Sequence, residues 1–146
     1  MREMTVINPA AGKGKIKIEG AYVTKEPGDC RRFVREACLD DPDVRFTVYG
    51  GDGTLNEAVS GILDAGAGEK AVLTSVPAGS GNDTVKTSDG YGPGEVRLDV
   101  IKVGDGYGIN MLNIGFDCNV VASAQRYKKV PLVSGNLSYI MGVARE

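Results

Sequence analysis

Short apolar runs alternate with helical hydrophobic patterns along the first half of the chain. From Cys30 to Cys38, apolar residues recur at i, i+3, i+4, i+7 and i+8, which is one face of a helix that Asp29 can cap. A second helical pattern covers residues 54–65 and ends at Gly66. The apolar runs have the length and composition of buried strands. They are residues 4–8, 21–24, 44–49 and 71–76.

Strands that alternate with helices indicate an α/β fold built on a parallel sheet. We therefore expect a Rossmann-like parallel sheet with helices on both faces over residues 1–95. Beyond it, residues 96–103 and 108–114 are typical of adjacent strands joined by a hairpin at residues 104–106. Residues 96–146 are therefore expected to begin a second, β-rich domain that is incomplete in this sequence.

The turn Gly-Gly-Asp-Gly-Thr at residues 50–54 lies between a predicted strand and a predicted helix. Glycines let a ligand approach the backbone, and a helix start offers unpaired N–H groups to phosphate. Asp52 fits such a site if a divalent cation lies between the carboxylate and the phosphates, or if it accepts hydrogen bonds locally. Thr54 and Glu57 also match a capping box, which is compatible with phosphate binding.

Two further loops follow predicted strands and are expected at the same sheet edge, where parallel α/β folds bind ligands. Residues 8–15 form a basic, Gly-rich loop, and residues 79–83 read Gly-Ser-Gly-Asn-Asp. Neither is a Walker A motif, and the chain has no G-x-G-x-x-G fingerprint. Together with residues 50–54 they predict a nucleotide site.

Composition excludes several classes of function. The net charge of −2 gives no electrostatic case for nucleic-acid binding. Histidine is absent, so Ser-His-Asp catalysis and His-ligated metals are excluded, and a bound cation would have oxygen ligands, which favours magnesium. Cys30 and Cys38 are expected to be buried thiols. No apolar run reaches the ~18 residues of a membrane span, and the N-terminus lacks a signal-peptide pattern, so we expect a cytoplasmic protein.

The three loop motifs, in this order, resemble those of the diacylglycerol kinase catalytic-domain family of soluble lipid kinases. Residues 8–14 resemble its opening motif, residues 50–57 its nucleotide signature and residues 77–83 its third motif. Residues 98–100 and 113–117 are similar to its later strands. NAD kinases share the Gly-Gly-Asp-Gly turn, so an NAD-kinase-like phosphotransferase remains an alternative, as does a non-catalytic nucleotide- or lipid-binding module.

The resemblance implies transfer of the γ-phosphoryl group of ATP to a lipid hydroxyl, such as that of diacylglycerol, with Mg²⁺ as cofactor. It implies a general base beyond Glu146, a magnesium site near Asp52, and a lipid substrate met at the membrane surface, where the protein would attach peripherally. It leaves open whether the protein is a homo-oligomer. The implied ATP contacts are Asn8, Pro9, Ala10, Ala11, Gly12, Thr24, Gly51, Asp52, Gly53, Thr54, Leu55, Asn56, Glu57 and Ser80.

Overall fold

A four-stranded parallel sheet organises the fold in the computed structural model, which describes residues 1–79, 82–88, 94–112 and 118. The strand order is β2-β1-β3-β4, and every neighbouring pair is parallel. The predicted parallel α/β fold is therefore confirmed. The strands are β1 (Arg2–Ile7), β2 (Tyr22–Val23), β3 (Val44–Gly50) and β4 (Val72–Pro77); the helices are η1 (Ala11–Gly14), α1 (Asp29–Asp40), α2 (Asp52–Asp64) and α3 (Asp83–Ser88).

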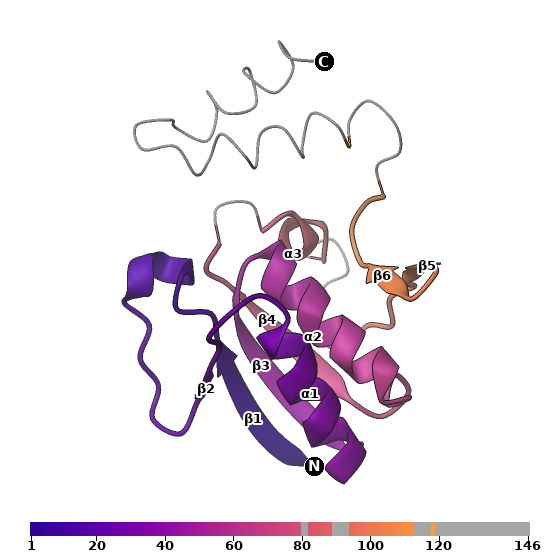
Figure 1. Cartoon of the computed structure of the whole chain (residues 1–146), viewed down its shortest axis with the longest axis horizontal. Helices are drawn as coiled ribbons and strands as arrows, with labels where there is room; N and C mark the ends of the chain where they lie inside the picture. The colour runs from indigo at the N-terminus through magenta and orange to yellow at the C-terminus, as the bar shows by residue number, and fades with distance from the viewer. Residues whose placement is uncertain (80–81, 89–93, 113–117, 119–146) are drawn as a thin grey trace. The chain divides into compact units, whose positions relative to one another are not determined.

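The core lies between one face of the sheet and the two long helices (Figure 1). In β3, Val44, Phe46 and Val48 are buried while the residues between them are half-buried, as the two-residue period of a strand requires. The apolar face of α1 and that of α2 pack on this row. In the described part of the chain, both long helices cover this same face.

Helices α1 and α2 approach closely because Gly61 has no side chain. A Cβ there would lie 2.5 Å from the Arg31 carbonyl oxygen. Arg31 also forms a two-pronged ion pair with Asp64, with N–O distances of 2.6 and 2.9 Å. Cys30 and Cys38 are free and buried on the inner face of α1, as predicted.

Several predicted boundaries were wrong. Helix α1 begins at Asp29, with Gly28 as its N-cap residue in the left-handed region (φ 86°), so Asp29 is inside the first turn and does not cap it. The hairpin strands are β5 (Ile101–Val103) and β6 (Gly106–Gly108), so the first strand starts after the predicted residue 96 and the second starts before the predicted Gly108. The reason is a two-residue turn, in which Gly104 supplies the positive φ of 56°.

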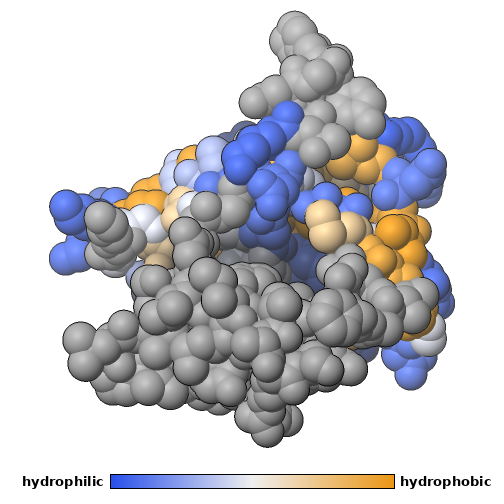
Figure 2. All heavy atoms as spheres, turned by 90° about the horizontal axis from the view of Figure 1, so that it is seen from above, coloured by the Kyte–Doolittle hydropathy of each residue, from blue (hydrophilic) through white to orange (hydrophobic). Residues whose placement is uncertain are grey.

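Residues 1–110 form one compact unit, which includes this hairpin. The predicted domain boundary after residue 95 stays a prediction. Exposed hydrophobic side chains, orange in Figure 2, occur on the side that carries the hairpin, and they include Val96, Leu98, Ile101 and Val103. Among the described residues, no helix is long and apolar enough to cross a membrane.

Candidate functional site

The carboxyl ends of the four strands meet at one edge of the sheet, and the predicted loops start there (Figure 1). Backbone hydrogen bonds continue the strand pairing one step into these loops. The Asn8 amide donates to the Tyr49 carbonyl, and the Thr24 amide donates to the Ile7 carbonyl, both at 2.9 Å. The parallel topology thus places Asn8, Thr24 and the start of the turn after β3 side by side. For the loops after β1 and β3 this is the predicted arrangement.

Asn8 joins the first loop to the second. Its Nδ2 donates a hydrogen bond to Thr54 Oγ1 at 2.8 Å, and its Oδ1 accepts one from the Ala10 amide at 2.9 Å. The second bond closes an Asx turn, which is why a short polar side chain suits the end of this strand. One side chain therefore holds its own loop and the first turn of α2.

The first loop is also joined to the third. The Gly12 amide donates to the Ala78 carbonyl at 2.7 Å, and the Ala78 amide donates to the Gly50 carbonyl at 2.9 Å. Gly12 has a φ of 60°, a conformation that glycine adopts without steric cost. The three loops are thus tied by backbone bonds into one rim.

Gly51 and Gly79 bring the second and third loops into backbone contact. A Cβ on Gly79 would lie 2.5 Å from the Gly51 Cα, which no real side chain permits. Asn82, at a φ of 56°, holds Gly79 by two hydrogen bonds: its Oδ1 accepts from the Gly79 amide and its Nδ2 donates to the Gly79 carbonyl. The close contact of the two loops therefore requires glycine at residues 51 and 79, whether or not a ligand binds there.

Asp52 reaches across the same contact. Its two carboxylate oxygens accept hydrogen bonds from the amides of Asp83 (3.1 Å) and Thr84 (3.0 Å), at the start of α3. Burial raises the pKa of Asp52, but these hydrogen bonds lower it by more, so the pKa is lowered overall. Asp52 is therefore an ionised acceptor that fixes the third loop, which is the local role that its sequence context left open.

Several rim amides among the described residues already have partners inside the protein. Those of Asn8, Ala10, Ala11, Gly12, Ala78 and Gly79 all donate internal hydrogen bonds. The first-turn amides of α2, from Asp52 to Thr54, have no carbonyl to bond within their own helix. Within the described part of this edge, the start of α2 therefore offers an anion backbone donors, and the helix dipole there also favours negative charge.

The predicted capping box was wrong. Helix α2 starts at Asp52 with Gly51 as N-cap residue, so Thr54 lies inside the first turn, and its hydroxyl accepts from Asn8. Glu57 instead accepts a hydrogen bond from the Gly28 amide at 2.9 Å, on the loop before α1. Glu57 therefore ties α2 to the loop that follows β2.

The other predicted contacts differ in what they expose. Ala11, Thr24 and Leu55 are buried, and the Leu55 side chain is only 5% exposed, so little of it could meet a ligand. Pro9 and Gly53 are exposed, and Asn56 is half-buried with its carbonyl bound by Ser60 Oγ. Ser80 lies outside the described residues.

Among residues 1–79, 82–88, 94–112 and 118, no three Cys, Asp or Glu side chains gather as a metal site.

One polar cluster near the rim was not anticipated from the sequence. Asp29 is buried and accepts hydrogen bonds from the Tyr22 hydroxyl, the Lys25 amide and the Arg32 guanidinium. In the sequence, Asp29 looked like an ordinary helix cap, and nothing marked Tyr22 of the second strand as its partner.

Comparison with known proteins agrees with this geometry. Residues 2–111 match the family model of the diacylglycerol kinase catalytic domain. The chain is 33% identical over 150 residues to "Probable lipid kinase YegS-like" of Chromohalobacter salexigens, covering 90% of this chain and 47% of the relative. It is 31% identical over 133 residues to the protein of the same name from Pectobacterium atrosepticum, covering 82% and 43%.

A solved structure has a similar fold. The crystal structure of a "putative diacylglycerol kinase" from Bacillus anthracis matches with a TM-score of 0.52 and 27% identity, over 60% of this chain and 33% of that one. The chain thus spans less than half the length of these relatives. The family match covers most of the described residues and all three loop motifs. The chain belongs to the diacylglycerol kinase catalytic-domain family.

Proposed function

We propose that the intact protein is an ATP-dependent lipid kinase, which transfers the γ-phosphoryl group of ATP to a lipid hydroxyl such as that of diacylglycerol. Family membership and the lipid-kinase names of the relatives support this activity. The observation that carries the nucleotide part is the interlocked rim, in which Asn8 bonds Thr54, Gly12 bonds Ala78, and Gly51 touches Gly79.

The triphosphate is proposed to lie against the first turn of α2, whose amides have no partner in their own helix. The remaining contacts proposed for ATP are those named from the sequence apart from the buried Leu55, and they include Thr24 on the neighbouring loop and Ser80 on the third. Phosphoryl transfer depends mainly on positioning and charge neutralisation, and both are within reach of such a rim.

Asp52 is proposed to lie near Mg²⁺. Each of its oxygens accepts one amide hydrogen bond and keeps a further lone pair, so the ionised carboxylate suits a hard cation. Magnesium is commonly held by one or two carboxylates together with phosphates and water, so a single carboxylate fits. When bound, the ion would neutralise developing charge on the phosphates. The general base is expected beyond Glu146, where the resemblance puts it.

The test is a phosphorylation assay on the intact protein with labelled ATP and two acceptors, diacylglycerol in vesicles and NAD. We expect transfer to the lipid, dependent on magnesium, with no label in NAD. Transfer to NAD alone would replace the proposed acceptor and retain the nucleotide site. No transfer together with retained ATP binding would identify a non-catalytic nucleotide-binding module.

A further inference from the structure

The buried carboxylate of Asp29 lies beside the loop that follows β2. The hydrogen bonds described for it do not involve the three loops of the rim. Asp29 is 1% exposed. A buried charge is costly unless it is paired and hydrogen-bonded. Here Tyr22 Oη lies 3.1 Å from both carboxylate oxygens, the Lys25 amide donates at 2.9 Å, and the Arg32 guanidinium donates a short bond. We call these four residues, Tyr22, Lys25, Asp29 and Arg32, the Asp29 clamp.

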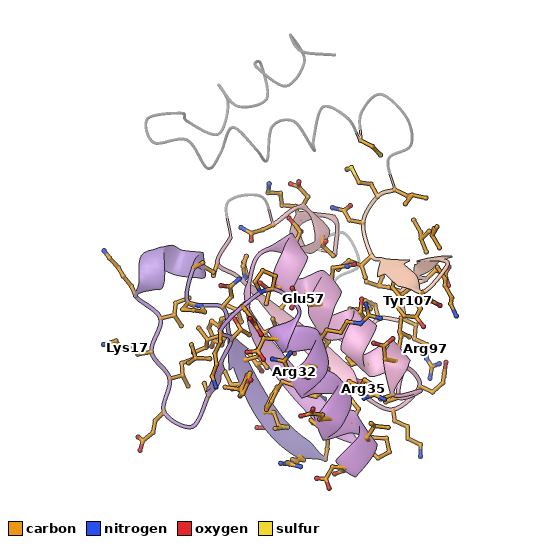
Figure 3. All side chains as sticks on the ribbon, in the orientation of Figure 1. Lys17, Arg32, Arg35, Glu57, Arg97 and Tyr107 are labelled. Atoms are coloured by element: carbon orange, nitrogen blue, oxygen red, sulfur yellow. The ribbon has the colours of Figure 1, made fainter. Side chains whose placement is uncertain are left out.

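Neighbouring residues hold the side chains of the clamp in place. The Tyr22 ring stacks on Phe33, with ring centroids 3.8 Å apart and planes within 7°, so the hydroxyl is held toward α1. Arg32 is labelled on α1 in Figure 3. Its Nη2 forms ion pairs with Asp29 Oδ1 and with Glu26 Oε1, the latter at 3.6 Å. The bond from the Lys25 amide is the largest cause of a lowered pKa of Asp29, and those from Tyr22 and Arg32 lower it further.

What the clamp holds is residues 24–28, which connect β2 to α1. At one end the Thr24 amide bonds the Ile7 carbonyl, and the next amide, of Lys25, bonds Asp29. At the other end the Gly28 amide bonds Glu57 of α2, which Figure 3 also labels. The loop is therefore fixed by a carboxylate from each long helix, and its amides at 25 and 28 are occupied rather than open to a ligand.

The position of the loop connects the clamp to the rim. Ile7, whose carbonyl receives the Thr24 amide, is the residue before Asn8, and Asn8 holds Thr54. Glu57 is one turn along α2 from Thr54. The loop is thus connected to the start of α2 at both of its ends, through Ile7 and Asn8 at one end and through Glu57 at the other. A change in the loop would therefore displace Thr24 relative to the start of α2.

We propose that Asp29 is a positioning residue for the nucleotide, which holds residues 24–28 in the shape that keeps the largely buried Thr24 at the edge of the ATP site. This inference rests on the proposed function. Asp29 does not touch the nucleotide; it acts through the loop. Misplacing a binding group by about 1 Å can cost roughly a hundredfold in rate. The effect should therefore appear in nucleotide use and not in lipid use.

A control carboxylate is Asp64 at the end of α2, which pairs with Arg31 of α1. Arg31 and Asp64 also form a two-pronged ion pair, but they join α1 to the far end of α2. Asp64→Asn therefore removes the charge of one helix-anchoring carboxylate without touching residues 24–28. Tyr22→Phe removes one hydroxyl from the clamp and leaves the stacked ring, which covers the case that an Asp29 variant does not fold.

The experiment measures KM for ATP, KM for diacylglycerol, kcat and Tm on the intact protein with Asp29→Ala, Asp29→Asn, Tyr22→Phe and Asp64→Asn. We expect Asp29→Ala to raise KM for ATP about tenfold or more, with KM for lipid unchanged. Asp29→Asn, which can still accept from the Lys25 amide, and Tyr22→Phe should raise it less. Asp64→Asn should lower Tm and leave KM for ATP unchanged.

Two outcomes would overturn the proposal. One is a KM for ATP within about twofold of the unmutated protein in every clamp variant that folds; the other is an equal rise in Asp64→Asn, which would mean a general loss of rigidity. Either result leaves the lipid-kinase proposal intact. If the unmutated intact protein neither binds nor uses ATP, the proposed function fails, and the positioning role fails with it.

Discussion

Asn8 and Thr54 are 46 residues apart in the sequence and are joined by a 2.8 Å hydrogen bond from Asn8 Nδ2 to Thr54 Oγ1. The bond connects the loop after β1 to the first turn of α2. It is partly buried, so breaking it from one side leaves the other polar group poorly solvated, which costs more than the net ~1 kcal/mol of an ordinary hydrogen bond. This pair is therefore a sensitive probe of rim assembly.

A double-mutant cycle with Asn8→Ala and Thr54→Val tests the coupling. Valine keeps the shape of threonine and removes the acceptor. We expect each single variant to lower the free energy of unfolding by about 1–2 kcal/mol, and the pair to lose less than the sum by about 0.5–1 kcal/mol. The measurement is urea unfolding followed by circular dichroism. Strictly additive losses would mean that the two side chains act independently.

Gly79→Ala tests the backbone contact between the second and third loops. The added methyl would lie 2.5 Å from the Gly51 Cα and 3.1 Å from the Gly51 amide nitrogen, and these backbone atoms cannot turn aside as the end of a flexible side chain can. We expect a loss of about 1–3 kcal/mol in the free energy of unfolding, typical of overpacking, and at least a tenfold weaker affinity for ATP by calorimetry.

Gly53→Ala is the folding control for that variant. It is exposed, lies in the first turn of α2, and a Cβ there meets no atom within 4 Å. Since alanine is favoured over glycine in a helix by up to about 1 kcal/mol, this variant should be at least as stable as the unmutated protein. If Gly79→Ala proved equally stable, the proposed steric role of the contact would be refuted.

The sequence predicted the elements of this rim better than its connections. The alternation of Val44, Phe46 and Val48 and the glycines after β3 placed the turn at the end of a buried strand, and the structure agrees. Parallel topology then brought the loops to one edge. Both inferences use short-range periodicity and a general rule of α/β sheets, so a single sequence suffices for them.

The partners of individual polar side chains could not be predicted. Glu57 matched a local capping pattern, but its acceptor oxygen is taken by the Gly28 amide, 29 residues away. Asp29 likewise looked like a cap until the approach of Tyr22 and Arg32 showed it to be a buried acceptor. A local sequence pattern indicates that a side chain can accept a hydrogen bond. Which donor it accepts from depends on how α1 packs against α2.

Asp52 has two roles to separate, the bonding of α3 and the proposed proximity to magnesium. Asp52→Asn keeps a carbonyl oxygen that can accept an amide hydrogen bond and removes the charge, whereas Asp52→Ala removes both. If the charge serves magnesium, both variants should lose more than about a hundredfold in kcat, while only Asp52→Ala should lose about 1–2 kcal/mol of stability. A kcat for Asp52→Asn near that of the unmutated protein would restrict Asp52 to its structural role.

The pH dependence of stability provides a separate test of Asp29. Its pKa is lowered from the ordinary value of 3.8, first because it accepts from the Lys25 amide. The unfolded chain therefore holds the proton more tightly than the folded one, so the stabilisation is complete above pH ~4 and is lost as pH falls through the folded pKa.

The measurement compares urea midpoints of the unmutated protein and Asp29→Asn between pH 7 and pH 2. We expect a constant difference from pH 7 to about pH 5 that shrinks below about pH 4. Taking the difference between the two proteins cancels the other carboxylates whose pKa values are lowered, Asp52 and Asp64. A difference that does not change over the whole range would show that folding does not shift the pKa of Asp29.

The most direct test of the nucleotide site is a crystal structure of the intact protein with a non-hydrolysable ATP analogue and magnesium. We expect phosphate oxygens within hydrogen-bonding distance of the amides of residues 52–54, on the rim where Asn8 bonds Thr54 and Gly51 touches Gly79. An analogue bound elsewhere, with those amides hydrated and the rim empty, would contradict the proposal.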